Sequence, residues 1–215
     1  MLVIPGFGFG AEIFDDIPLD HNVLSFPDDV SPSEGMADLE KFLREKRVET
    51  ISLLGWSKGV YAACGLVRAK PFLCDKIFLI GARPFYPPED IERFRENLSR
   101  NARGTMIDFY KRCLSPEENG VYREFYQKYL RGYIARTAPG TLMAGIDELS
   151  RSRLDMTGVP LKRVAFIHGL EDKVAPIGDM ERWKPDLGPV YFIAVDGAGH
   201  MPFLREDVCE IISRF

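Results

Sequence analysis

Short runs of apolar residues alternate along the chain with longer segments in which apolar residues recur every three to four positions. The short runs have the length and aliphatic content of buried strands, and they lie at residues 1–4, 22–26, 51–54, 76–80, 164–167 and 190–195. The longer segments, such as residues 33–46 and the stretch after residue 59, predict helices. Because the two kinds of segment alternate with short connections, we expect a mostly parallel sheet with helices on both faces.

This alternation stops between residues 87 and 153. The segment keeps helical spacing and is rich in phenylalanine and tyrosine. We therefore predict an α/β core formed by residues 1–86 and 154–215, with residues 87–153 inserted as a helical cap. A cap lined by aromatic rings suits an acyl chain better than a sugar. The alternative is that these rings only pack the cap onto the core.

The predicted cap is also basic. Residues 91–136 contain ten cationic and six anionic side chains, although the whole chain has a net charge of −4. Clustered arginines can attract and bind an acidic partner. The alternative is an ordinary solvated helix surface.

The composition narrows the class of protein. The chain has 215 residues, of which 46% are hydrophobic and 28% are charged, as expected for one globular domain with a buried core. Its net charge of −4 argues against a nucleic-acid-binding protein, and no apolar run approaches the ~18 residues of a membrane span. Since no signal-peptide pattern is found either, we expect a cytoplasmic protein.

The cysteines and histidines give no sign of a metal site. Cys64, Cys74, Cys113 and Cys209 lie far apart and form no C-x-x-C pair. Buried free thiols are therefore expected in preference to disulfides or a metal site. With only three histidines in the chain, we expect neither a metal ion nor a cofactor.

Residues 50–66 contain the strongest chemical signal. A buried strand is followed by Gly55-Trp56-Ser57-Lys58-Gly59 and then by an apolar helix. This is the G-x-S-x-G pattern in its strand–turn–helix context, in which the serine hydroxyl projects at a helix N-terminus. The glycines leave room for the backbone to pass closely at the turn. We predict Ser57 as a nucleophile, the alternative being a chance match in an ordinary loop.

A glycine-rich loop, Pro5-Gly6-Phe7-Gly8-Phe9-Gly10, follows the first predicted strand. Its spacing matches neither G-x-G-x-x-G nor a Gly-Lys-Ser/Thr phosphate loop, which argues against a nucleotide site. In a serine hydrolase such a loop supplies one of the two backbone N–H groups of the oxyanion hole. We assign these donors to the N–H groups of Phe7 and Lys58. The alternative for the loop is a flexible turn.

An acid and a histidine follow the last two predicted strands. Asp172 comes shortly after the strand at residues 164–167, and His200 lies in a glycine-rich loop after the strand at residues 190–195. His168 ends a buried strand and is expected to be structural. The order Ser57, Asp172, His200 is that of an α/β-hydrolase triad. In it, His200 would take the serine proton and Asp172 would stabilise the imidazolium.

Motifs along nearly the whole chain resemble those of the α/β-hydrolase family. They are PGFG at 5–8, GWSKG at 55–59, GLED at 169–172 and GH at 199–200. Within the family the chain most resembles the BioH-type pimeloyl-[acyl-carrier protein] methyl ester esterases of biotin synthesis, through GWS at 55–57, MAGIDEL at 143–149 and HMPF at 200–203. The resemblance implies a compact α/β-hydrolase fold of about six strands, without the first two strands of the full fold, and with a small helical cap.

The resemblance also implies roles for particular residues. In such esterases, cap arginines bind the acidic acyl-carrier protein while the acyl chain reaches the serine. By resemblance, Trp56 and Phe109 would line the acyl path, and Arg103, Arg112 and Arg123 would bind the carrier.

The expected function is therefore hydrolysis of the methyl ester of pimeloyl-acyl-carrier protein through an acyl-enzyme. A general short-chain carboxylesterase or a thioesterase of the same fold is the alternative. A non-catalytic binding protein with a hydrolase fold is a third possibility.

Overall fold

The structure is a computed structural model of the chain. It describes residues 1–15, 17, 41, 44–45, 47–71, 73–118, 124–130, 132–133, 138–183 and 190–215. The predicted strand at residues 22–26 lies outside these residues, as does most of the predicted helix at residues 33–46.

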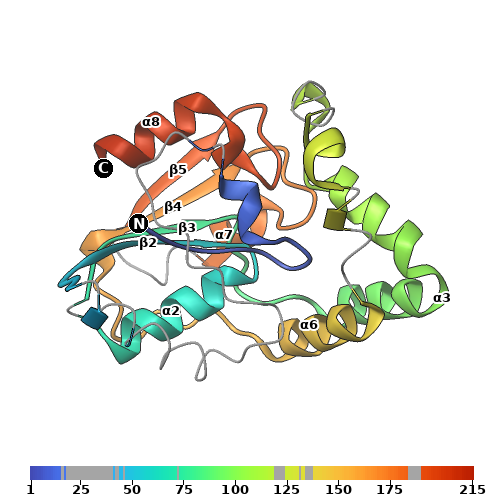
Figure 1. Cartoon of the computed structure of the whole chain (residues 1–215), viewed down its shortest axis with the longest axis horizontal. Coiled ribbons are helices and arrows are strands. Elements are labelled where there is room, and N and C mark those ends of the chain that lie inside the picture. The colour runs from blue at the N-terminus through green and yellow to red at the C-terminus, as the bar shows by residue number, and fades with distance from the viewer. Residues whose placement is uncertain are drawn as a thin grey trace.

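The described residues form one five-stranded sheet (Figure 1). Its strands are β1 (Leu2–Ile4), β2 (Ile51–Trp56), β3 (Cys74–Ile80), β4 (Val164–Gly169) and β5 (Tyr191–Val195). They lie in the order β1-β2-β3-β4-β5, and all neighbouring pairs are parallel. Because the strands are parallel and adjacent, the loops that follow them meet at one edge of the sheet.

Helices cover both faces of the sheet, as the alternating pattern predicted. They are α2 (Gly59–Ala69), α7 (Ile177–Trp183) and α8 (Glu206–Arg214), with short 3₁₀ helices η1 (Ala11–Phe14), η4 (Leu161–Arg163) and η6 (Pro202–Leu204). Successive strand residues point to opposite faces: Leu53 and Ile77 pack in one core with α2, whereas Leu54 and Phe78 pack in a second core with α8. Figure 1 shows α2 and α8 on opposite sides of the sheet.

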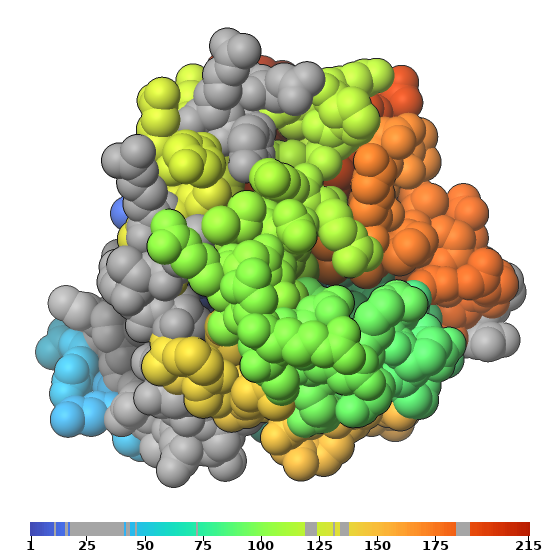
Figure 2. All heavy atoms as spheres, turned by 90° about the vertical axis from the view of Figure 1, so that its right-hand side faces the viewer, coloured from blue at the N-terminus to red at the C-terminus, as the bar shows by residue number. Residues whose placement is uncertain are grey.

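Between β3 and β4 most of the described residues are helical. It forms α3 (Pro88–Arg112), η2 (Pro116–Glu118), the π-helical turn η3 (Tyr126–Leu130) and α6 (Pro139–Arg151). The helices α3 and α6 pack against each other beside the carboxyl ends of the strands (Figure 1), and Figure 2 shows α3 crossing that face of the molecule. The two ends of this helical segment are adjacent, since Leu154 N–H donates to the Pro84 carbonyl at 2.8 Å. The exact boundaries of a cap at residues 87 and 153 stay a prediction.

Helix α3 bends at Asn101, whose backbone is not helical (φ −156°, ψ 80°). The side-chain oxygen of Asn101 accepts a hydrogen bond from the Gly104 N–H at 3.0 Å, so Asn101 caps the second half of the helix. The bend allows α3 to run on toward the loops that follow β4 and β5. No helix in the described part of the chain is long and apolar enough to cross a bilayer.

Candidate active site

Ser57 lies at the sharp turn between β2 and α2. Its φ is +55°, a left-handed conformation that is strained for a residue with a Cβ. Its backbone N–H donates to the Ile80 carbonyl of β3 at 2.9 Å. Neither flanking glycine can carry a side chain without a steric clash. A Cβ on Gly55 would lie 2.7 Å from a side chain of α2, and a Cβ on Gly59 would overlap the Ile4 carbonyl oxygen. The strained turn inferred from the sequence is thus present around Ser57.

Asp172 and His200 form a buried pair. Nδ1 of His200 donates to Asp172 Oδ2 at 2.7 Å, and Asp172 Oδ1 accepts the backbone N–H groups of Val174 and Ala175, each at 2.8 Å. Burial alone would raise the pKa of Asp172, but His200 and these hydrogen bonds outweigh it and lower that pKa below its usual value. Asp172 is therefore an ionised acceptor that fixes the orientation and tautomer of His200.

Ser57 and His200 meet at the end of β3. A Cβ on Gly81, the residue after Ile80, would lie 2.9 Å from His200 Nδ1. His200 Nε2 is buried and has no hydrogen-bond partner among the described residues, whereas Ser57 Oγ lies 3.5 Å from the Tyr86 hydroxyl. The structure therefore brings the three predicted triad residues to one place without a hydrogen bond between Ser57 and His200. Such bonds commonly tighten only when substrate is bound.

Trp56 does not line a path to the serine, contrary to its expected role. Its side chain is fully buried and packs against Phe9, Phe14 and Phe203. Its indole N–H donates to the His200 carbonyl at 2.7 Å. The pleat of β2 turns this side chain into the core, so Trp56 contacts the His200 loop and does not line the cavity beside Ser57.

The helical segment also holds the histidine loop. Just after α3, the Cys113 carbonyl accepts the His200 N–H at 2.7 Å. Glu118 Oε2 accepts the N–H groups of Gly199, at 3.0 Å, and Ser115, at 2.6 Å. Burial raises the pKa of Glu118. Sequence reasoning counted Glu118 only as a cap charge, and no local motif marks a contact between residues this far apart in the chain.

His168 lies at the end of β4 and is buried. Its Nε2 contacts the Ala175 carbonyl and lies 3.5 Å from Asp172 Oδ2. Burial lowers the pKa of His168, so this ring is a neutral neighbour of the Asp172 loop.

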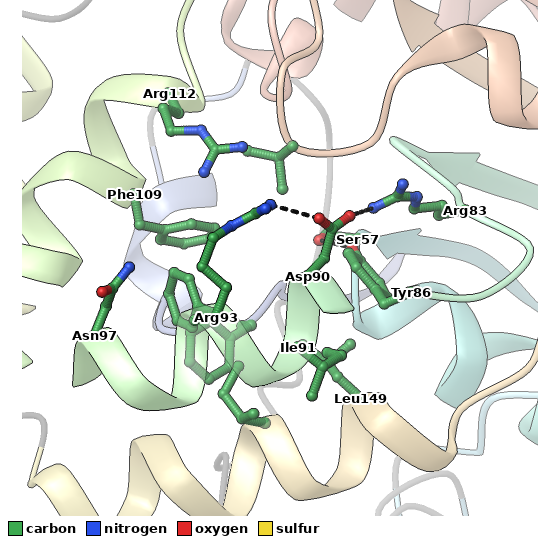
Figure 3. A pocket seen from close by; sticks show the side chains of 14 residues that line it. Ser57, Arg83, Tyr86, Asp90, Ile91, Arg93, Asn97, Phe109, Arg112 and Leu149 are labelled. Carbon is green, nitrogen blue, oxygen red and sulfur yellow. Dashed lines mark hydrogen bonds and ion pairs between the residues drawn. The ribbon is translucent and has the colours of Figure 1, made fainter. Parts of the chain in front are cut away.

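A cavity of about 110 Å³ opens beside Ser57 (Figure 3). One part of its lining is apolar: the rings of Phe7, Phe94 and Phe109 pack edge to face, with centroids 5.7–5.8 Å apart. Phe109 from α3 thus lies where the resemblance suggested, although its contact with a substrate stays a prediction.

The glycine-rich loop passes directly beside the nucleophile. A Cβ on Gly6 would lie 3.0 Å from the Ser57 Cβ, which explains why this position has no side chain. The ring of Phe7 lines the cavity. Lys58 directly precedes α2, and its ammonium pairs with Glu148 of α6 at 2.9 Å. The use of the Phe7 and Lys58 N–H groups as an oxyanion hole stays a prediction.

The other part of the cavity lining is charged (Figure 3). Asp90 accepts hydrogen bonds from both Arg83 and Arg93. Arg112, predicted to bind a partner, also lines the cavity, and its guanidinium donates to the Lys173 carbonyl at 2.9 Å. Of the other two predicted partner residues, Arg103 is exposed on α3 and Arg123 lies outside the described residues.

Sequence reasoning missed Tyr86, which contacts the Ser57 hydroxyl and lines the cavity. The available signal was its position in the loop after the strand next to the nucleophile strand. The cysteines agree with expectation, since all four are free and buried. Within the described ranges, no group of three or more His, Cys, Asp or Glu side chains could hold a metal ion.

Comparison with known proteins identifies the fold. No family model and no curated protein matches the chain. Among solved structures, an α/β hydrolase from a deep-sea metagenome library has a TM-score of 0.74 at 13% identity and covers 99% of this chain and 86% of its own. The chain has the α/β-hydrolase fold. An esterase from Exiguobacterium antarcticum shares this fold with a TM-score of 0.78 at 15% identity, and the match covers 99% of this chain and 90% of the esterase. A bromoperoxidase from Bacillus anthracis also shares it, with a TM-score of 0.79 at 15% identity, and that match covers 99% of this chain and 90% of the bromoperoxidase.

Proposed function

We propose that this protein is a serine carboxylester hydrolase with Ser57, His200 and Asp172 as its triad. The observation that carries the proposal is the buried Asp172–His200 pair at the same sheet edge as a strained serine turn. His200 Nε2 is not engaged by another described residue, so it is available to take a proton from Ser57. Several proteins with similar structures are described as esterases, which supports this choice among the activities of the fold.

The proposed reaction has two steps. In the first, His200 Nε2 removes the Ser57 proton while Oγ attacks the ester carbonyl, and the protonated imidazole then gives this proton to the departing alcohol. In the second, His200 removes a proton from water, which attacks the acyl-enzyme and releases the acid. Asp172 stabilises the imidazolium in both steps. The N–H groups of Phe7 and Lys58 would bind the oxyanion, each worth about 3–4 kcal/mol of barrier.

For the substrate, we propose the methyl ester of a pimeloyl group on acyl-carrier protein. The aromatic lining of the cavity suits an acyl chain. The arginines beside it, Arg93 and Arg112, and the exposed Arg103 on the same helix would attract an acidic carrier. The assignment to biotin synthesis rests on the sequence resemblance.

The test is release of methanol from pimeloyl-carrier methyl ester, measured beside hydrolysis of p-nitrophenyl butyrate. Wild type and Ser57→Ala are compared on both substrates. Turnover that depends on Ser57 and strongly prefers the carrier ester supports the whole proposal. Ser57-dependent turnover of the small ester alone keeps the hydrolase and removes the carrier substrate.

A general short-chain carboxylesterase is the second candidate, and the small cavity of about 110 Å³ favours it. Comparing kcat/KM across p-nitrophenyl esters of increasing acyl length separates the two, since a short-chain enzyme loses activity beyond a few carbons. A protein with no catalytic role would also fail to react with a fluorophosphonate probe at Ser57.

A further inference from the structure

Tyr86 is the side chain that hydrogen-bonds Ser57 in this structure. Its hydroxyl lies 3.5 Å from Ser57 Oγ, and its ring lines the cavity (Figure 3). Burial raises the pKa of Tyr86 to about 12. The phenol therefore keeps its proton at neutral pH and is a permanent hydrogen-bond donor.

Contacts around the ring hold Tyr86 in place. The guanidinium of Arg83 lies over the ring, 5.3 Å from its centroid. Arg83 is itself fixed by Asp179 at 2.6 Å and Asp90 at 3.3 Å, and its carbonyl accepts the Tyr61 hydroxyl at 2.9 Å. A hydroxyl carried on so constrained a ring loses little further entropy when it binds a reacting group.

The strand order places Tyr86 on a particular side of the serine. Ser57 follows β2, the loop with Gly6 and Phe7 follows β1 on one side, and the loop with Gly81 and Tyr86 follows β3 on the other. His200 lies on the β3 side, because a Cβ on Gly81 would lie within 2.9 Å of its ring. The Tyr86 hydroxyl contacts Ser57 Oγ and is near enough to Asp172 for that charge to raise the pKa of Tyr86, so it lies on the histidine side of Ser57, opposite the loop assigned to the oxyanion.

We infer that Tyr86 is a catalytic hydrogen-bond donor to the oxygen that exchanges its proton with His200: the leaving alcohol oxygen in acylation and the water oxygen in deacylation. The inference rests on the proposed ester hydrolase. Both oxygens must come within reach of His200 Nε2, and by microscopic reversibility they occupy the same position. That position lies beside Ser57 Oγ on the side where Tyr86 is found.

Tyr86 keeps its own proton throughout. In acylation the bond from Ser57 Oγ to the carbonyl carbon forms, the bond to the alcohol oxygen breaks, and the Ser57 proton reaches that oxygen through His200. In deacylation the water oxygen bonds to the carbon, the bond to Oγ breaks, and a water proton returns to Ser57 through His200. Tyr86 orients the oxygen and stabilises its partial charge in each case.

The test is Tyr86→Phe, which removes only the hydroxyl, followed by stopped-flow kinetics with p-nitrophenyl butyrate. p-Nitrophenolate leaves without needing a proton. The rate of the acylation burst, in which one equivalent is released, should therefore stay within about twofold of the wild-type rate. Deacylation, and hydrolysis of methyl butyrate, should each slow by about tenfold or more, the effect of losing one hydrogen bond. Tyr191→Phe, which removes an exposed hydroxyl on β5, should keep wild-type rates on both esters.

Two results would overturn the inference. One is unchanged turnover of both esters by Tyr86→Phe. The other is that Tyr86→Phe slows the acylation burst and deacylation equally, which would mean that the Tyr86 hydroxyl donates to the oxyanion. Stoichiometric fluorophosphonate labelling of Tyr86→Phe establishes that the variant is folded. Ser57→Ala, measured in parallel, distinguishes failure of this inference from failure of the proposed function. If Ser57→Ala keeps its turnover, the proposed function itself is wrong. If Ser57→Ala is inactive and Tyr86→Phe has normal rates, only the role of Tyr86 is wrong.

Discussion

The nucleophile and the histidine are positioned in different ways. Ser57 is held mainly by residues next to it in sequence: Gly55 and Gly59 flank it, and the strand and helix on either side are continuous with it. One hydrogen bond, from its N–H to the Ile80 carbonyl, comes from the neighbouring strand. The His200 loop is held from a distance, by the indole of Trp56 and by Cys113 and Glu118 from the helical segment between β3 and β4. A local turn therefore fixes one half of the site, and long-range hydrogen bonds fix the other. Substitutions at the serine turn should therefore mainly lower stability, whereas substitutions that release the His200 loop should mainly lower kcat.

The largest effect on stability is expected at the serine turn. Gly59→Ala should lower the free energy of unfolding by more than about 2 kcal/mol, since the new methyl group overlaps the Ile4 carbonyl oxygen. Gly65→Ala in the same helix meets no atom within 4 Å and should raise stability by about 0.5–1 kcal/mol. Urea unfolding of both variants measures the difference. Similar values for the two would mean that the turn is not sterically constrained.

The helical segment should affect catalysis more than binding. Glu118→Leu removes the acceptor for the Gly199 and Ser115 N–H groups and leaves both donors buried. We expect kcat to fall about tenfold or more with little change in KM. Glu118→Gln should recover most of the rate, because one amide oxygen can accept both bonds that Oε2 now accepts. Equal losses in the two variants would show that these hydrogen bonds do not position His200.

A smaller effect is expected on the outer surface of the same helical segment. Arg103→Glu, on the exposed side of α3, should raise KM for the carrier-bound ester about fivefold, because like charges repel an acidic partner. Hydrolysis of p-nitrophenyl butyrate should not change. Arg214→Glu on α8 is the control, since it makes the same charge change on another helix. If both variants weaken the carrier reaction alike, the effect is one of net charge and not of a docking surface.

The smallest effect is a dependence of stability on pH. Burial raises the pKa of Glu118 above its ordinary value of 4.5, so the folded state binds this proton more tightly than the unfolded state. The resulting stabilisation is complete below pH 4.5 and is lost as the pH rises through the folded-state pKa. The free energy of unfolding of wild type should therefore fall relative to that of Glu118→Gln across this range. If the free energies of unfolding of wild type and Glu118→Gln change with pH in parallel, Glu118 titrates in the folded protein as it does in the unfolded chain.

The same division between local and distant contacts determines what could be predicted. Apolar runs locate the five described strands, and the Gly55–Gly59 pattern locates the turn, because both are properties of neighbouring residues. Asp172 could be located from its place after β4, and the structure has it hydrogen-bonded to His200.

The remaining features depend on contacts between residues far apart in sequence. Glu118 and Tyr86 gain their roles from residues in other elements, and no spacing rule links them to the site. Trp56 lies within the serine motif, but the pleat of its strand turns it into the core, where it contacts the His200 loop.

The proposed mechanism requires that Ser57 forms an acyl-enzyme by means of His200. The most direct measurement is mass spectrometry of the protein quenched during hydrolysis of p-nitrophenyl butyrate, with peptide mapping of the adduct. We expect one butyryl group, on Ser57, and we expect both this adduct and turnover to be absent from Ser57→Ala. Turnover that persists in Ser57→Ala, or an adduct confined to another residue, would contradict it.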